Sequence, residues 1–256
     1  MPLERRLLSS ATMCRVWTVL GLSFTLCANS AFGGECPATL VGGEPALRQL
    51  KSQPRLSFIR EHLRSDAHHA RTWSYSWAAI YSSLAVGQFV AAPLVSHASG
   101  LDLYVGGGAA LIGLVPLVVT PLKVMGDAKR LDDFRIDMAG TDSCVSLAWA
   151  EELLVRDAED EAGGRSLLFH GGNVVFNAGI FFVIGAGFGH WTSATISLLT
   201  GIATGEIMIF TQPVGALDAL HAYRNGDLSS PTAAVRIAIV PLVARNASGV
   251  VLLLTF

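Results

Sequence analysis

Four long apolar stretches constrain this chain more than any other feature of its sequence. They cover about residues 72–96, 103–122, 167–190 and 194–217, and each is close to the roughly 20 residues that a helix needs to cross a bilayer. Hydrophobic residues make up 51% of the chain and charged residues 15%, whereas an average soluble domain has about 25% charged residues. We therefore predict a mainly α-helical integral membrane protein. The alternative is a soluble exported protein that buries these helices.

Two very short loops arrange the four stretches in pairs. The loops span residues 97–102 and 191–193, and connections of this length join antiparallel neighbours. The sequence therefore predicts two membrane helical hairpins, at 72–122 and 167–217. A polar segment at 123–166 lies between them and includes an amphipathic helix.

The beginning of the chain has the three parts of a secretory signal peptide. Basic residues come first, an apolar run follows at 16–26, and small residues then occupy the positions of two cleavage sites. We predict a signal peptide at 1–33, either cleaved or kept as an anchor, followed by a linker and a polar helix at 34–71. Pro54 should break or kink that helix.

The end of the chain has a different character. Residues 235–243 and 250–256 are rich in Val, Ile and Leu, and the segment between them, 245–249, is turn-like. This pattern predicts a short C-terminal β-hairpin within a tail at 218–256.

The signal peptide and the basic residues disagree about orientation. Lys and Arg are absent from both tight loops, and the positive-inside rule would place the opposite, charged side in the cytoplasm. The signal peptide places that side outside. We follow the signal because its parts occur in order, and we expect a cell-envelope protein whose charged segments are exported. We prefer the inner membrane to association with the outer membrane.

Glu206 is the most informative polar residue, because it lies inside the fourth apolar stretch. A carboxylate at the centre of a spanning helix costs about 2.5–3.5 kcal/mol on insertion scales, so it should face the bundle interior or stay protonated. Counting inward from the charged side places Asn177 at a similar depth and His170 nearer the surface. With Gln88 and Gln212 these residues form either a polar pathway or a set of interhelical hydrogen bonds. We favour the hydrogen-bonding interpretation.

Small residues at four-residue spacing predict where helices pack closely. In a membrane such residues let two helix backbones approach each other. The predicted packing positions are Ala109, Gly113, Gly185, Gly189, Gly201 and Gly205.

The two hairpins share a spacing of about 92 residues. Ala109 and Gly113, followed by a proline, resemble Gly201 and Gly205, also followed by a proline, and Asp-Ala pairs recur around each hairpin. The pattern suggests an internal repeat. Chance recurrence of common residue pairs is the alternative.

Cys36 and Cys144 are the two cysteines that follow the predicted signal peptide. An even number of cysteines in an exported chain permits a disulfide. Two spans separate the pair, so both cysteines should lie on the same side of the membrane. The alternative is two unrelated, partly buried thiols.

Nothing in the sequence argues for catalysis. The net charge of -2 provides no basic surface for a nucleic acid. Histidines on the polar helix at 34–71 are read as solvated residues in preference to metal ligands. We therefore expect no catalytic residue, no metal and no cofactor.

We therefore expect the protein to be a non-enzymatic structural or interaction subunit of the cell envelope. Its expected partners are the lipid bilayer and either an envelope protein or a second copy of the chain. Two alternatives stay open. One is a small transport or channel component that uses Glu206, and the other is a membrane enzyme with His and Glu chemistry at the charged side.

Overall fold

The computed structural model describes most of the chain beyond the predicted signal peptide. The described residues are Cys36, 46–47, 50–137 and 143–229, with the backbone alone at most of 236–244 and 247–255. The predicted signal peptide at 1–33 and most of the predicted linker lie outside them. The chain divides into two compact units, Met1–Gly34 and Glu35–Phe256, and the description below concerns the second.

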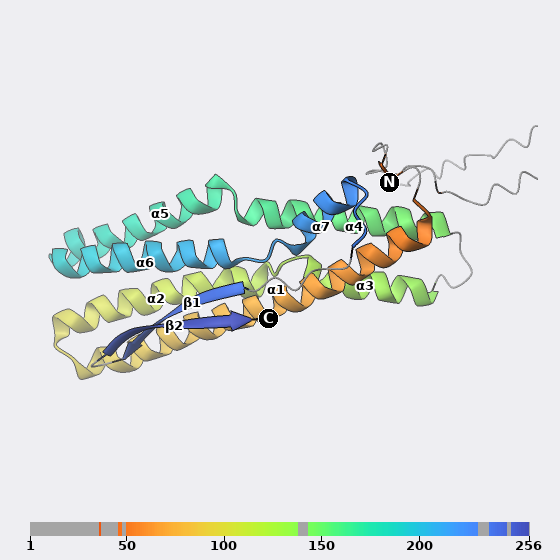
Figure 1. Cartoon of the computed structure of the whole chain (residues 1–256). Coiled ribbons are helices and arrows are strands. Elements are labelled where there is room, and N and C mark those ends of the chain that lie inside the picture. Colours follow the sequence, from red (N-terminus) through yellow and green to blue (C-terminus); the bar gives the residue numbers. More distant parts are fainter. Residues whose placement is uncertain are drawn as a thin grey trace, which may run out of the picture. The chain divides into compact units, whose positions relative to one another are not determined.

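Helices form most of this unit (Figure 1). In chain order they are α1 (Ser52–Ala91), η2 (Ala92–Leu94), α2 (His97–Val119), α3 (Val124–Asp137), α4 (Ser143–Gly164), α5 (Leu167–Phe182), η3 (Val183–Gly187), α6 (Trp191–Thr211) and α7 (Gly215–Arg224).

Four helical segments are long and apolar enough to cross a membrane: Ser52–Leu94, His97–Asp133, Cys144–Gly187 and Trp191–Arg224. The prediction of a mainly helical chain with four candidate spans is therefore confirmed. Each segment is longer than the roughly 20 residues that a bilayer requires. Each segment combines an apolar part, which is long enough to cross a bilayer, with a more charged end.

The breaks between helices fall at residues that favour them. Ser96 caps α2, because its hydroxyl accepts a hydrogen bond from the Ser99 backbone N–H at 3.3 Å. Pro121 follows the end of α2 and Pro213 follows the end of α6, and proline cannot continue the helical hydrogen-bond ladder. Gly189, with φ of +77°, reverses the chain before α6, a conformation that favours glycine.

Each membrane hairpin is a close pair of helices, α1 with α2 and α5 with α6 (Figure 1). The first pair is filled by a small apolar cluster of Trp77, Tyr81, Ala85 and Ala110. Aromatic rings of α1 thus lie against small residues of α2, which lets the two backbones approach.

A second core lies outside the apolar segments. The first half of α1 packs with α3, α4 and α7, and we call these four segments the polar bundle. Its fully buried apolar residues recur at helical spacing, as expected for amphipathic helices with one face on a common core. They include Ile59, Leu63, Leu131, Leu147, Leu154 and Tyr223.

The polar bundle differs from the sequence prediction in two ways. Pro54 lies in the first turn of α1, where proline is tolerated, so the predicted break or kink is wrong. The sequence also has a run of acidic residues at Asp157 and 159–161. Such a run is usually a solvated face, and we expect it to end the amphipathic helix. This expectation is wrong for Asp157 and Glu161. Instead, α4 continues to Gly164 and buries both side chains, because this face of α4 packs against α1, α3 and α7.

The described tail contains one more helix and two strands. α7 occupies residues that the sequence analysis assigned partly to the second hairpin and partly to the tail. The backbones of β1 (Arg236–Ala244) and β2 (Ala247–Thr255) pair antiparallel, and the pairing extends to Ala244 and Ala247. Residues 247–249, which were expected in the turn, therefore belong to β2.

Candidate functional site

The membrane part of the chain holds one concentrated group of polar side chains, between α5 and α6. Glu206 of α6 uses both carboxylate oxygens there. The Asn173 amide donates to its Oε1 at 2.9 Å, and His170 Nδ1 lies 2.5 Å from its Oε2. The same Asn173 amide also donates to the Ile202 carbonyl at 3.0 Å. One carboxylate thus ties α6 to two residues of α5.

Asn177 extends this group by one turn of α5. Its amide nitrogen donates to the Asn173 backbone carbonyl at 2.9 Å and to Asn173 Oδ1 at 2.8 Å. The Asn177 side chain is buried. We call His170, Asn173, Asn177 and Glu206 the polar quartet.

The polar quartet corrects the predicted depths. Asn173, which the sequence analysis did not select, contacts Glu206 in place of Asn177, and His170 lies at the level of Glu206 and not nearer the surface. The reason is the position of the helix ends. α6 ends at Thr211, so Glu206 lies only about one and a half turns from its end, whereas the predicted stretch continued to residue 217.

Two predicted packing glycines explain how the quartet fits between the helices. A Cβ atom on Gly205 would lie 2.2 Å from Asn173 Oδ1, and one on Gly201 would lie 1.9 Å from Asn177 Oδ1. Both asparagines therefore rest directly on the α6 backbone. The four-residue spacing of the glycines matches the four-residue spacing of the asparagines, which is the signal that could have identified Asn173.

The other two predicted polar residues lie elsewhere. Gln88 of α1 packs against α2, where a Cβ on Gly106 would lie 2.0 Å from its Oε1. Gln212 is buried at the junction of α6 and α7 and donates to the Glu161 carbonyl at 3.4 Å. Neither residue is hydrogen-bonded to Glu206, so the five predicted residues do not form one site.

The remaining packing positions have mixed outcomes. Gly113 lies under the Tyr81 ring and Gly185 under the Trp191 ring, with prospective Cβ distances of 2.7 and 2.6 Å. Ala110, one residue after the predicted Ala109, is the alanine buried in the α1–α2 cluster. Gly189 was expected to pack against a helix, but a Cβ there would meet nothing within 4 Å. Its role is the turn described above.

No family model, curated protein or solved structure matches this chain. Its function therefore has to be argued from its own residues.

Outside the membrane, a buried charged group joins three helices of the polar bundle. The Arg55 guanidinium of α1 forms an ion pair with Glu151 of α4, and its Nε donates to the Tyr223 hydroxyl of α7 at 2.7 Å. The same hydroxyl donates to Glu151. All three side chains are buried, and burial, followed by the hydrogen bond to Glu151, raises the pKa of Tyr223.

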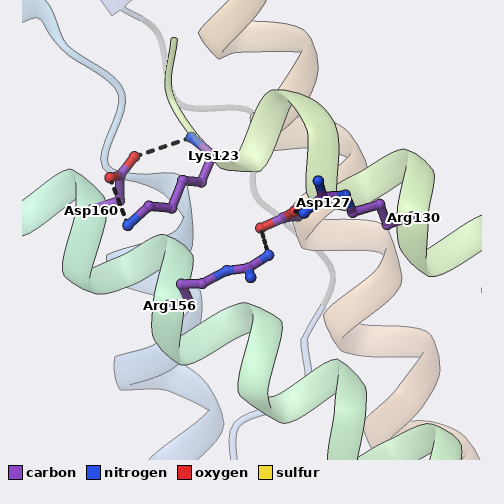
Figure 2. Close-up of polar contacts among 5 residues, drawn as sticks. All are labelled: Lys123, Asp127, Arg130, Arg156 and Asp160. Atoms are coloured by element: carbon purple, nitrogen blue, oxygen red, sulfur yellow. Dashed lines mark hydrogen bonds and ion pairs between the residues drawn. The ribbon is translucent and has the colours of Figure 1, made fainter. Parts of the chain in front are cut away.

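A second charged group joins α3 to α4 near the membrane-spanning segments (Figure 2). Asp127, in the first turn of α3, pairs with Arg156 of α4 and with Arg130 at 3.2 Å. Lys123 binds Asp160 twice, through its backbone N–H at 3.0 Å and its ammonium group at 3.1 Å. These contacts fix the start of α3 against α4.

Two buried carboxyl groups of α4 face other carboxyl groups. Burial, strengthened by neighbouring Asp127, raises the pKa of Asp157 to about 9. Burial together with Asp66 of α1 raises the pKa of Glu161 to about 10. Both α4 residues are therefore protonated near neutral pH, because two adjacent buried carboxylates cannot both stay charged.

The Asp66–Glu161 pair also caps a helix. Asp66 Oδ2 accepts a hydrogen bond from the Ala216 N–H at 3.2 Å, and Glu161 Oε2 accepts one from the Leu217 N–H at 3.0 Å. These donors are the unpaired amides at the start of α7, where a helix end favours negative charge.

Cys36 and Cys144 form a disulfide, with their Cα atoms 5.1 Å apart. The bridge joins the segment before α1 to the start of α4. Cys36 is buried, and it belongs to the same apolar core as α1 and α7.

The two hairpins are joined by hydrogen bonds at both ends. Near the polar bundle, the indole N–H groups of Trp73 and Trp77 both donate to the Thr211 hydroxyl at 3.2 Å. At the loop end, His190 Nδ1 lies 2.7 Å from Asp102 Oδ1.

These arrangements limit the chemistry that the described residues can support. Nowhere in the described ranges do three His, Cys, Asp or Glu side chains gather as a metal site would require. The polar quartet combines one imidazole, one carboxylate and two amides, and such a set can hold or release a proton.

Proposed function

We propose that this chain is a non-enzymatic membrane subunit of the cell envelope that binds a partner through its polar bundle. The observation that supports this most is the continuity between the spans and the bundle. α1 runs without a break from the bundle into the membrane, and the other three bundle helices each adjoin a span. Spans and bundle therefore form one helical framework.

The charged contacts of the bundle support a structural role. Arg55, Glu151 and Tyr223 bind one another, and Asp127 binds two arginines. A buried charge that is paired and hydrogen-bonded fixes neighbouring helices in one arrangement. The bundle then offers its outer, charged surface to an envelope protein or to a second copy of the chain.

The proposed location follows the signal peptide. Residues 1–33 would direct export, and the polar bundle would lie on the exported side of the membrane. The Cys36–Cys144 disulfide supports this side, since disulfides persist in oxidising compartments. The proposal retains the C-terminal hairpin, supported by the backbone pairing of β1 with β2, as part of the fold class.

Charge reversals on the bundle surface test the assembly role. Glu61 and Glu152 are exposed on α1 and α4, so Glu61→Lys and Glu152→Lys should preserve the fold. We expect the parent protein, gently solubilised from its native membrane, to migrate above monomer size in native electrophoresis. At least one reversal should release the monomer, whereas Glu206→Gln should leave the assembly intact. A parent protein that is monomeric in its native membrane would contradict the proposal.

A transport or channel component is the second candidate. It is favoured by the partial exposure of two members of the polar quartet, since the side chains of His170 and Glu206 are 24% and 25% exposed. In that case Glu206→Gln would abolish ion or proton flux into proteoliposomes, while the two surface reversals would leave flux unchanged.

A further inference from the structure

The two membrane hairpins pack in the same way at positions 92 residues apart. In the first hairpin, Tyr81 of α1 lies on Gly113 of α2. In the second, Asn173 of α5 lies on Gly205 of α6. Tyr81 and Asn173 are 92 residues apart, and so are Gly113 and Gly205. The residue that rests on the glycine therefore has an exact counterpart in each hairpin.

The polar bundle repeats in the same manner, with a spacing of 91 residues. Positions of α1 and their counterparts in α4 are buried in both helices. The equivalent pairs are Leu56 and Leu147, Ile59 and Ala150, Leu63 and Leu154, Asp66 and Asp157, and Ala67 and Ala158. Residues 52–133 and 144–224 are thus two copies of one arrangement, consisting of a long helical segment, a hairpin and a short bundle helix.

The two copies differ at the polar quartet. The first-copy counterparts of His170, Asn173, Asn177 and Glu206 are Ala78, Tyr81, Ala85 and Leu114. Tyr81 and Ala85 are buried in the apolar α1–α2 cluster, and Leu114 packs against it. An apolar set therefore holds the first hairpin together with the same glycine contact. The second hairpin therefore does not need a carboxylate for packing, and a carboxylate within an apolar helix pair is costly unless it has partners.

We infer that His170 and Glu206 form a proton-binding site, which the second copy carries and the first copy lacks. His170 Nδ1 and Glu206 Oε2 are hydrogen-bonded at 2.5 Å. The pair can take up one further proton, which is shared between the imidazole and the carboxyl group. Release of this further proton to solvent leaves a neutral imidazole whose Nδ1–H donates to the carboxylate. Asn173 holds the second carboxylate oxygen and keeps Glu206 aligned in both states.

The groups around the pair come from α5, from α1 and from just after the end of α4. α5 contributes His170 and the amide of Asn173 to Glu206. Trp73 and Trp77 of α1 donate to Thr211 of α6, and Ile207 and Met208 of α6 pack against the cluster that contains Trp77 and Tyr81. The Arg165 guanidinium donates to the carbonyls of Phe210 and Gln212, both at 2.6 Å, beyond Glu206 toward the polar bundle.

Both side chains of the pair are about a quarter exposed on the surface of the helix pair. This inference is independent of the assembly role. Glu206 can exchange a proton whether or not the polar bundle binds a partner, and the surface reversals described above leave the pair intact.

Infrared difference spectroscopy on the full chain in lipid nanodiscs tests proton binding. Between acidic and alkaline buffer, the parent should show a carboxyl band that Glu206→Gln removes. His170→Gln should shift the pH at which this band titrates by at least one unit. Glu152→Gln, which changes an exposed acid of the bundle, should leave the band unchanged. A band that survives in Glu206→Gln, or a midpoint unmoved by His170→Gln, would overturn the inference.

A residue exchange between the copies tests the packing argument. The variant His170→Ala, Asn173→Tyr, Asn177→Ala and Glu206→Leu gives the second hairpin the residues of the first. It should fold, keep the melting temperature of the parent within a few degrees, and lack the carboxyl band. If this variant unfolds while Glu206→Gln stays folded, the polar quartet is a packing device and the inference fails.

Discussion

Gly205 shows at the scale of one residue how helix packing and polar chemistry depend on each other. The missing side chain lets Asn173 rest on the α6 backbone, and from that position Asn173 reaches Glu206. Gly201 provides the same space for Asn177. The glycine motif of α6 therefore provides space for two asparagine side chains and also lets the helices pack closely.

Replacing Gly205 tests whether Asn173 needs this space on the α6 backbone. Gly205→Ala places a methyl group 2.2 Å from Asn173 Oδ1 and should cost about 1–3 kcal/mol, as overpacking does. Gly179→Ala in α5 is the matched control, because a Cβ there meets nothing within 4 Å. We expect thermal unfolding in detergent to show a melting temperature several degrees lower for Gly205→Ala alone. Equal melting temperatures for both variants would show that Asn173 does not depend on the space at Gly205.

Protonation of the Asp157 carboxyl group makes the free energy of unfolding depend on pH. Its pKa is raised to about 9 in the folded chain, against about 3.9 in an unfolded one. Its contribution to the unfolding free energy is therefore fully present below pH 4 and is lost as the pH rises toward 9. The slope for one such proton is about 1.4 kcal/mol per pH unit.

Asp157→Asn should remove this dependence, because an amide mimics the protonated carboxyl group. Thermal unfolding between pH 5 and 9 is expected to show a flatter profile for the variant than for the parent. Glu159→Gln, an exposed acid on the same helix, serves as the control and should follow the parent. Parallel profiles for Asp157→Asn and the parent would show that Asp157 is ionised in the folded chain.

At the scale of elements, the sequence predicted the four spans because long apolar stretches have few other stable forms. It did not predict α3 and α7. Both are short, and α3 is also rich in charged residues. α7 nevertheless buries Ala216, Ala219, Leu220 and Tyr223, a helical spacing that a closer examination of the tail could have found.

Burial of ionisable side chains was the main feature that sequence patterns could not supply. Asp157 and Glu161 resemble solvated residues until α1, α3 and α7 are known to surround α4. Asn173 was missed for a related reason. Its partner depends on where α6 ends, and residue counts along an apolar stretch do not locate that end.

The Arg55–Glu151–Tyr223 group is the element-scale test of the polar bundle. Arg55→Met leaves Glu151 buried without its counter-charge and should destabilise the protein by about 3–5 kcal/mol. Arg64→Met removes an ion pair with Asp132 at the surface, where the Arg64 side chain is 64% exposed. This variant should lose less than about 1 kcal/mol of unfolding free energy. Denaturant titration in detergent measures both values. Similar losses of unfolding free energy in the two variants would mean that the buried Arg55–Glu151 pair is no more important for stability than an exposed pair.

At the scale of the whole molecule, the two hairpins differ in how they continue into the polar bundle. α1 passes from the polar bundle into the membrane as one helix, whereas its counterpart is divided into α4 and α5 at residues 165–166. An unbroken helix transmits a tilt of its outer part to its inner part. The first hairpin is therefore continuous with the polar bundle, whereas a two-residue break separates α4 from α5.

The disulfide makes part of this molecule a closed covalent ring. Cys36 and Cys144 are 108 positions apart in sequence, and the first hairpin lies within that interval. One cut by a protease at any bond inside the ring opens it without separating the two pieces. On a non-reducing denaturing gel the cut protein should run as a single band. After reduction it should separate into two bands. Two bands without reductant would mean that the ring is open in the native protein.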